Sequence, residues 1–118
     1  MNRTKDHPTE MTPALSDLAF HILLALGDGP SHGYAIGKDL EARSGGRLDP
    51  TTGALYQALR RLTDEALIEP VDGPGEADAR RKYFALTSLG RSAAAAEARR
   101  LEALVRTARQ RKLYPQRA

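Results

Sequence analysis

Hydroxyl, amide and guanidinium side chains share one face of the helix that the sequence predicts after residue 48. That polar face consists of Thr52, Tyr56, Gln57 and Arg60. The opposite face follows the i, i+4, i+7, i+11 spacing of a buried helical stripe and consists of Leu55, Leu59, Leu62 and Ala66. Polar side chains of these types near a helix N-terminus can reach phosphates and base edges in a DNA major groove. The simpler interpretation is an amphipathic helix that shows polar residues to solvent.

A second set of residues that could bind a phosphate is the basic cluster Arg80, Arg81 and Lys82. It opens a predicted strand at 81–86, which follows a loop at 72–79 and an earlier predicted strand at 67–71. A helix followed by strand, loop and strand is the order of a winged helix-turn-helix, and it places the cluster where a wing can touch the DNA backbone. Charges that keep an edge strand from aggregating are the alternative explanation. In the second strand we expect Phe84 to face the core.

Gly53 lies in the first turn of the predicted recognition helix and lowers its helix propensity by about 1 kcal/mol relative to Ala. A bare backbone there permits close approach, either of a phosphate or of a neighbouring helix. The sequence leaves both explanations open.

Two further helices must hold this unit. The first carries Leu15, Leu18, Ile22 and Leu26 on one stripe, with Phe20 and Leu24 on a second side, so two surfaces should cover it. The second is expected at about 33–43, after Ser31 or His32 as N-cap. The recognition helix is predicted to begin with Asp49 as N-cap and Pro50 in its first turn.

The last predicted helix has Thr87 or Ser88 as its N-cap and extends to about Lys112. About 25 residues at 1.5 Å each give a rod of about 37 Å, too long to be buried against so small a body. Its apolar residues step by three and four, as in a coiled-coil seam. With the second side of the first helix, they form the predicted dimer interface: Phe20, Leu24, Ala94, Ala98, Leu101, Leu104, Val105 and Ala108.

Composition excludes several function classes. The chain of 118 residues contains no cysteine, so it has no disulfide, thiolate metal site or cysteine nucleophile. Its three histidines have no metal-ligand spacing, and no nucleophile with a base can be assembled, so we expect no metal, no cofactor and no enzymatic activity. No apolar run approaches a membrane span, and the N-terminus lacks a signal-peptide core, so we expect a cytoplasmic protein.

The net positive charge of the chain favours an anionic partner, but this charge is unevenly distributed along the sequence. The net charge is +3 and the sequence pI is about 9.5. From residue 11 to residue 71, however, five Lys or Arg residues face eight Asp or Glu residues, whereas 97–118 contains seven basic and two acidic residues. Phosphate neutralisation would therefore depend on selected side chains and helix N-termini.

Three segments resemble the PadR family of bacterial transcriptional regulators. They are His32-Gly-Tyr-Ala-Ile36, Thr52-Gly-Ala-Leu-Tyr-Gln-Ala-Leu-Arg-Arg-Leu62, and Arg80-Arg-Lys-Tyr-Phe-Ala-Leu-Thr87 followed by Gly90. The likeness covers most of 15–90, and the single short C-terminal helix is similar to the small-bodied subgroup. Two residues depart from the family pattern: Gln57 stands where Pro is frequent, and Ala66 stands where Gly commonly ends the recognition helix.

The resemblance implies a homodimer that binds double-stranded DNA. Together with the residue patterns, it gives the predicted DNA-binding set Tyr34, Thr51, Thr52, Gly53, Tyr56, Gln57, Arg60, Arg80, Arg81 and Lys82. It also implies, for some members, release by a small apolar or aromatic effector. Because the chain contains no tryptophan, Phe20 and Tyr114 are the aromatic candidates to contact such an effector.

The sequence thus predicts a mainly α fold with a small two-stranded antiparallel wing. The expected organisation is a flexible arm at 1–12, a winged helix-turn-helix domain at 13–86, and a dimerisation helix with its tail at 87–118. The predicted function is transcriptional regulation, as a repressor on a palindromic operator. The rival hypothesis is a winged helix that docks a protein and does not bind DNA, which the acidic balance of the helical body keeps open.

Overall fold

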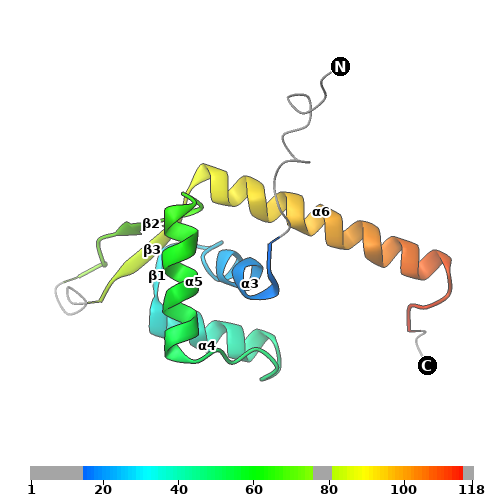
Figure 1. Ribbon diagram of the computed structural model, residues 1–118, viewed down its shortest axis with the longest axis horizontal. Coiled ribbons are helices and arrows are strands. Elements are labelled where there is room, and N and C mark those ends of the chain that lie inside the picture. The colour runs from blue at the N-terminus through cyan, green and yellow to red at the C-terminus, as the bar shows by residue number, and fades with distance from the viewer. Residues whose placement is uncertain (1–14, 76–80, 116–118) are drawn as a thin grey trace, which may run out of the picture.

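The computed structural model describes residues 15–75 and 81–115; the predicted arm at 1–12 and Arg80 lie outside these ranges. Its helices are α3 (Asp17–Ala25), α4 (Gly33–Arg43), α5 (Thr52–Asp64) and α6 (Ser88–Gln110), and its strands are β1 (Ser31–His32), β2 (Ile68–Val71) and β3 (Tyr83–Leu86). Figure 1 shows α3, α4 and α5 gathered beside the small sheet, with α6 extending away from them. The predicted fold class is confirmed.

The sheet has three antiparallel strands in the order β1-β3-β2, one more than predicted. Strand β1 pairs Ser31 with Phe84 and His32 with Tyr83. A strand of two residues has no periodicity of its own, so only its distant partner identifies it. Strand β2 lies at an edge, as the proline in it, Pro70, requires.

The core lies where α3 meets α4, α5 and the start of α6. It contains aliphatic side chains from every helix except α6, together with the inner side of the sheet. Its most buried members are Ile22, Leu23, Leu26, Ile36, Leu40, Leu59, Leu62 and Ile68. Phe84 joins this cluster, which confirms its predicted direction. Tyr83 is buried as well, because the ring of His32 covers it edge-on at 5.1 Å between centroids.

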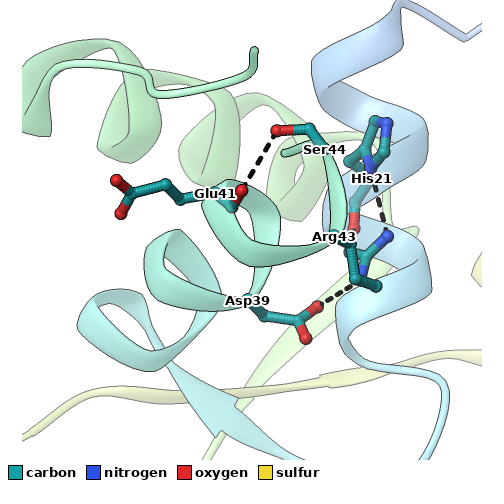
Figure 2. Close-up of polar contacts among 5 residues, drawn as sticks. All are labelled: His21, Asp39, Glu41, Arg43 and Ser44. Atoms are coloured by element: carbon teal, nitrogen blue, oxygen red, sulfur yellow. Dashed lines mark hydrogen bonds and ion pairs between the residues drawn. The ribbon is translucent and has the colours of Figure 1, made fainter. Parts of the chain in front are cut away.

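An arginine joins the end of α4 to α3. The guanidinium of Arg43 donates to the backbone oxygen of His21 and lies within 3.1 Å of the ring Nδ1 of the same residue. Asp39 holds the guanidinium from its other side, at 2.7 Å (Figure 2). These two contacts of one guanidinium with His21 restrict the angle between α3 and α4. Helix α5 packs against both of these helices.

The predicted start of α5 at Asp49 and Pro50 is wrong. The N-cap is Thr51, whose Oγ1 accepts the backbone N–H of Ala54 at 3.0 Å, and the helix begins at Thr52. Asp and Thr cap helices comparably well, so the sequence offered two caps two residues apart. Gly53 therefore lies even closer to the helix N-terminus than predicted.

Helix α5 ends through a left-handed residue that is not glycine. Ala66 has a φ of 64°, Leu67 donates its N–H to Leu62 at 3.0 Å, and Ala66 donates to Thr63 at 3.0 Å. This pair of bonds is a Schellman motif, with Ala66 in the position that glycine usually occupies. Ala66 thus adopts the left-handed conformation, at a cost of about 1 kcal/mol.

Helix α6 begins against the end of α5 and then leaves the body. Thr87 caps it through the N–H of Gly90 and donates its hydroxyl to the carbonyl of Ala66 at 2.7 Å. Gly90 lies directly on the carbonyl of Leu67, where a Cβ would overlap. With 23 residues the helix is about 34 Å long, and its far half is exposed. Within the described ranges, no helix combines the length and apolar composition needed to cross a bilayer.

Candidate nucleic-acid interface

The first half of α5 presents a polar, open face. Thr51, Thr52, Gly53, Gln57 and Arg60 are all exposed. Leu55, Leu59 and Leu62 point the other way into the core, as the spacing predicted. The prediction is wrong for Ala66, the fourth residue of that stripe, which is exposed because the helix ends at Asp64 and Ala66 lies in the turn that follows. The structure therefore keeps these polar side chains available to a partner outside the chain.

No other part of the described chain lies where a side chain on Gly53 would be. A Cβ built on this residue meets nothing within 4 Å, and its φ lies outside the left-handed region. The neighbouring helix thus gives no reason for a glycine here. Of the two explanations left open by the sequence, packing against a neighbouring helix is therefore not the reason, and the space over Gly53 is open.

Tyr56 of α5 contacts the start of α4. A Cβ on Gly33 would overlap the hydroxyl and ring of Tyr56, so only glycine lets the ring lie there. Tyr56 remains 43% exposed. Its position beside the α4 N-terminus brings one residue of α5 next to the segment that contains His32 and Tyr34. This contact is not evident from the sequence of α5, because it depends on a glycine 23 positions away.

Tyr34 stands out from the first turn of α4. It is 66% exposed, and the ammonium of Lys38 lies 5.7 Å from the centre of its ring. The two residues are one helical turn apart, and the distance is that of a cation–π contact. Lys38 was absent from the predicted site, although it adds a positive charge beside a predicted contact residue.

The base of the wing contacts α4 through a histidine. Arg81 and Lys82 are exposed just before β3, and the Nη1 of Arg81 lies 2.9 Å from the Nε2 of His32. His32 is also the N-cap of α4, because its Nδ1 accepts the N–H of Ala35 at 3.2 Å. Helix α5 and the base of the wing thus meet at the N-terminus of α4.

The predicted dimer residues divide between two environments. Leu101, Leu104 and Val105 are 36%, 56% and 40% exposed on the far half of α6, and Leu24 on α3 is 44% exposed. Ala98 is exposed too, whereas Phe20 and Ala108 are half-buried. Ala94 packs against the core of its own chain. The exposed apolar surface therefore belongs mainly to the outer part of α6.

Glu97 is a buried charge that the sequence analysis missed. It is 6% exposed, accepts the N–H of Leu15 at 3.3 Å, and binds the guanidinium of Arg100 through both oxygens. The hydrogen bond from Arg100 lowers the pKa of Glu97 by more than burial raises it, and the N–H of Leu15 adds to the lowering. Glu97 and Arg100 at i, i+3 resemble an ordinary surface pair, so only the contact with Leu15 distinguishes them.

Comparison with known proteins connects this arrangement to regulators. Residues 22–96 match the transcriptional regulator PadR-like family. A 37.1 kDa uncharacterized protein in transposon Tn4556 of Streptomyces fradiae is 45% identical over 76 residues, which are 64% of this chain. The match spans 20% of that relative's length.

Solved structures share the fold. A PadR family transcription regulator from Clostridium difficile has a TM-score of 0.69 at 23% identity, covering 80% of this chain and 97% of its own. A transcriptional regulator from Clostridium thermocellum has a TM-score of 0.67 at 22% identity, covering 82% and 97%. PadR of Bacillus subtilis, in complex with operator DNA, has a TM-score of 0.57 at 26% identity, covering 65% and 44%.

Proposed function

The chain belongs to the PadR-like family of transcriptional regulators, and from that premise we propose that it binds duplex DNA as a homodimer and represses transcription from a palindromic operator. Repression would follow because the bound dimer blocks promoter access. The DNA complex of the Bacillus subtilis relative supports the partner class.

The observation that carries the proposal is the open first half of α5. Its exposed residues are a hydroxyl pair, an amide and an arginine, and the bare backbone at Gly53 faces outward with free space around it. A major groove admits an α-helix whose N-terminal residues meet base edges. We assign base contact to Gln57 and Arg60, and close backbone approach to Gly53.

In this proposal, side chains on both sides of α5 contact phosphates of the DNA backbone. Tyr34 with Lys38 lies on α4, and Arg81 with Lys82 lies on the wing. Side chains of this kind fix the register of a protein on the duplex but do not distinguish sequences. They also compensate for the acidic balance of the helical body, because the positive charges are placed where the phosphates would lie.

A second copy would bind along the outer half of α6. Leucine and valine at 101, 104 and 105 are exposed on a helix that has left the body, so a partner helix is the natural means of covering them. The proposed organisation is a DNA-binding domain at 13–86 and a dimerisation helix at 87–118. Two-fold symmetry would then give a palindromic operator, with half-sites about one helical turn apart.

Salt-dependent binding is the experiment that tests the partner class. The protein is titrated against random duplex DNA at two salt concentrations, followed by selection of bound sequences from a random pool. We expect affinity that falls steeply as salt rises, because phosphate contacts release counterions, and a palindrome among the selected sequences. Absence of measurable binding at low salt would instead support the protein-docking alternative.

The proposal also includes control by a small apolar or aromatic effector. Of the two aromatic candidates, Phe20 is half-buried on α3, and Tyr114 lies at the end of α6 with the guanidinium of Arg109 4.2 Å from its ring centre. The cation occupies one face of the Tyr114 ring, so Phe20 is the better candidate to contact an effector between two subunits.

A further inference from the structure

Glu97 lies at the point where α6 leaves the body of the protein. The helix is attached to the body at its start, where Gly90 lies directly on the carbonyl of Leu67. About two helical turns further along, the carboxylate of Glu97 accepts the backbone N–H of Leu15 at 3.3 Å. Beyond Glu97 the helix is exposed at almost every position (Figure 1). Glu97 therefore contacts the body at the last point before the helix becomes free.

The contact between Glu97 and Leu15 is buried and directional, unlike the apolar contacts beside it. Glu97 is 6% exposed, and both of its oxygens bind the guanidinium of Arg100, so water has little access to the carboxylate. The neighbouring residues of α6 that pack on the core are alanines, Ala93 and Ala94. Apolar burial is non-directional, whereas a hydrogen bond requires a defined distance and angle. Glu97 thus restricts the direction of α6 in a way that the alanines do not.

A buried carboxylate in an ion pair is better suited to select one geometry than to add stability. The charge loses water when it is buried, so an apolar side chain of the same size is often as stabilising. The geometry selected here is the direction of α6 relative to α3 and the segment before it. Helix α3 also packs against α4 and α5, so the direction of α6 is fixed relative to these helices as well.

We propose that Glu97 is a positioning residue, which fixes the direction of α6 through Leu15 and thereby sets the distance between the two α5 helices of the dimer. This inference rests on the proposed function and adds to it the residue that determines half-site spacing. Along the helix axis, Glu97 is about 10 Å and Leu104 about 21 Å from Gly90. A displacement of about 1 Å at Glu97 would therefore become about 2 Å at Leu104, and up to about 4 Å between two subunits, which exceeds the rise of one base pair.

The distance between two spin labels in one chain tests the positioning without DNA. The chain contains no cysteine, so Asp64→Cys at the end of α5 and Thr107→Cys on the outer part of α6 provide two exposed sites for labels. Labelled chains are diluted into an excess of unlabelled protein, so that the distance reports on a single subunit. Glu97→Met has a similar size but no acceptor for the N–H of Leu15, and we expect it to shift or broaden the distance distribution by about 2 Å. Glu97→Gln keeps an acceptor and is the matched control, with an unchanged distribution.

Operators of altered spacing test the consequence for DNA binding. Once a palindrome has been selected, one base pair is inserted or removed between its halves, which moves one half-site by about 3.4 Å and turns it by about 35°. The wild type and Glu97→Gln should bind the altered operators about tenfold more weakly than the selected one, whereas Glu97→Met should discriminate by about threefold or less. This ratio compares two duplexes on the same protein, so a loss of stability or of active protein cancels out of it.

The two measurements separate failure of this inference from failure of the proposed function. If the wild type binds no DNA at low salt, the proposed function and the spacing role both fall, and the label distances still decide whether Glu97 directs α6. If Glu97→Met keeps the wild-type distance distribution, or broadens it and still discriminates between spacings like the wild type, the positioning role is overturned. Should Glu97→Met not fold, Leu15→Pro decides, because proline has no backbone N–H and the variant removes the donor in place of the acceptor. Leu15→Pro should then give the relaxed spacing, and full discrimination by it would overturn the inference.

Discussion

Gly53 is the residue at which folding and binding should respond in opposite directions. Because a Cβ there meets nothing within 4 Å, Gly53→Ala should stabilise the free protein by about 0.5–1 kcal/mol through helix propensity. The same methyl group should obstruct the approach of the helix to DNA, so we expect affinity to fall at least tenfold. Thermal denaturation and DNA titration measure the two effects.

Gly37→Ala provides the control for that pair of measurements. A Cβ on Gly37 would make an ordinary contact with Leu55 at 3.5 Å, inside the body, so this variant should gain stability without losing affinity. If Gly53→Ala binds DNA as well as Gly37→Ala does, the close-approach role of Gly53 is wrong.

Ala66 offers a second residue-scale prediction, concerned with stability alone. Its φ of 64° strains any residue with a Cβ, so Ala66→Gly should relieve about 1 kcal/mol while the Schellman bonds stay in place. Part of this gain is offset by the greater freedom of glycine in the unfolded chain. We expect a rise of a few degrees in the thermal midpoint and unchanged DNA affinity; a lower midpoint would show that no strain is stored there.

At the scale of elements, patterns within one segment were predictable and contacts between segments were not. The leucine spacing of α5 correctly gave the buried face of the helix. The edge position of β2 agrees with the proline that it contains, Pro70. The start of α5 was misplaced because two adequate caps stood two residues apart. Strand β1 was missed because its pairing with β3 bridges about 50 residues. The roles of predicted site residues stay predictions.

Long-range polar contacts were equally hidden from the sequence. His32 appeared to be a candidate cap, but its contacts with Tyr83 and Arg81 come from a strand far along the chain. Glu97 was assigned no role from the sequence. Both were missed for the same physical reason, since neither residue type nor local spacing indicates which distant backbone a side chain will meet.

Glu97 gives an element-scale prediction about the attachment of α6 to the segment before α3. Glu97→Gln keeps an acceptor for the N–H of Leu15 but loses the charge that binds Arg100, so we expect a loss of about 0.5–1 kcal/mol at pH 7. The pKa of Glu97 is lowered in the folded state, so its stabilisation is fully present above the ordinary value of 4.5 and is lost as pH falls through the lowered pKa.

The difference in unfolding free energy between the wild type and Glu97→Gln should therefore depend on pH in a defined way. Denaturant titrations at neutral pH should separate the two proteins, and those carried out progressively below pH 4.5 should bring them together. A gap that stays constant to low pH would mean that the carboxylate charge does not contribute, and that the substitution acts through packing.

At the scale of the whole molecule, the outer half of α6 should decide the assembly. Leu104→Glu places a charge in the exposed apolar seam without touching the core, so we expect a folded monomer in place of the proposed wild-type dimer. Light scattering coupled to size exclusion measures the mass, and circular dichroism the folding. Ala103→Glu, on the opposite side of the same helix turn, should leave the dimer intact; equal behaviour of both variants would remove α6 from the interface.

The spacing between the operator half-sites tests whether the two subunits bind DNA as one rigid dimer. Once a palindrome has been selected, inserting five base pairs between its halves turns one half-site to the opposite side of the duplex, while inserting ten restores the facing direction but lengthens the gap by about 34 Å. A dimer joined through α6 has a fixed distance between its recognition helices, so both insertions should reduce affinity to that of a single half-site. Leu104→Glu should bind all three duplexes equally weakly, because its subunits bind independently. Full affinity of the wild type for either inserted operator would mean that the subunits are flexibly linked, and that α6 does not set the distance between the grooves they read.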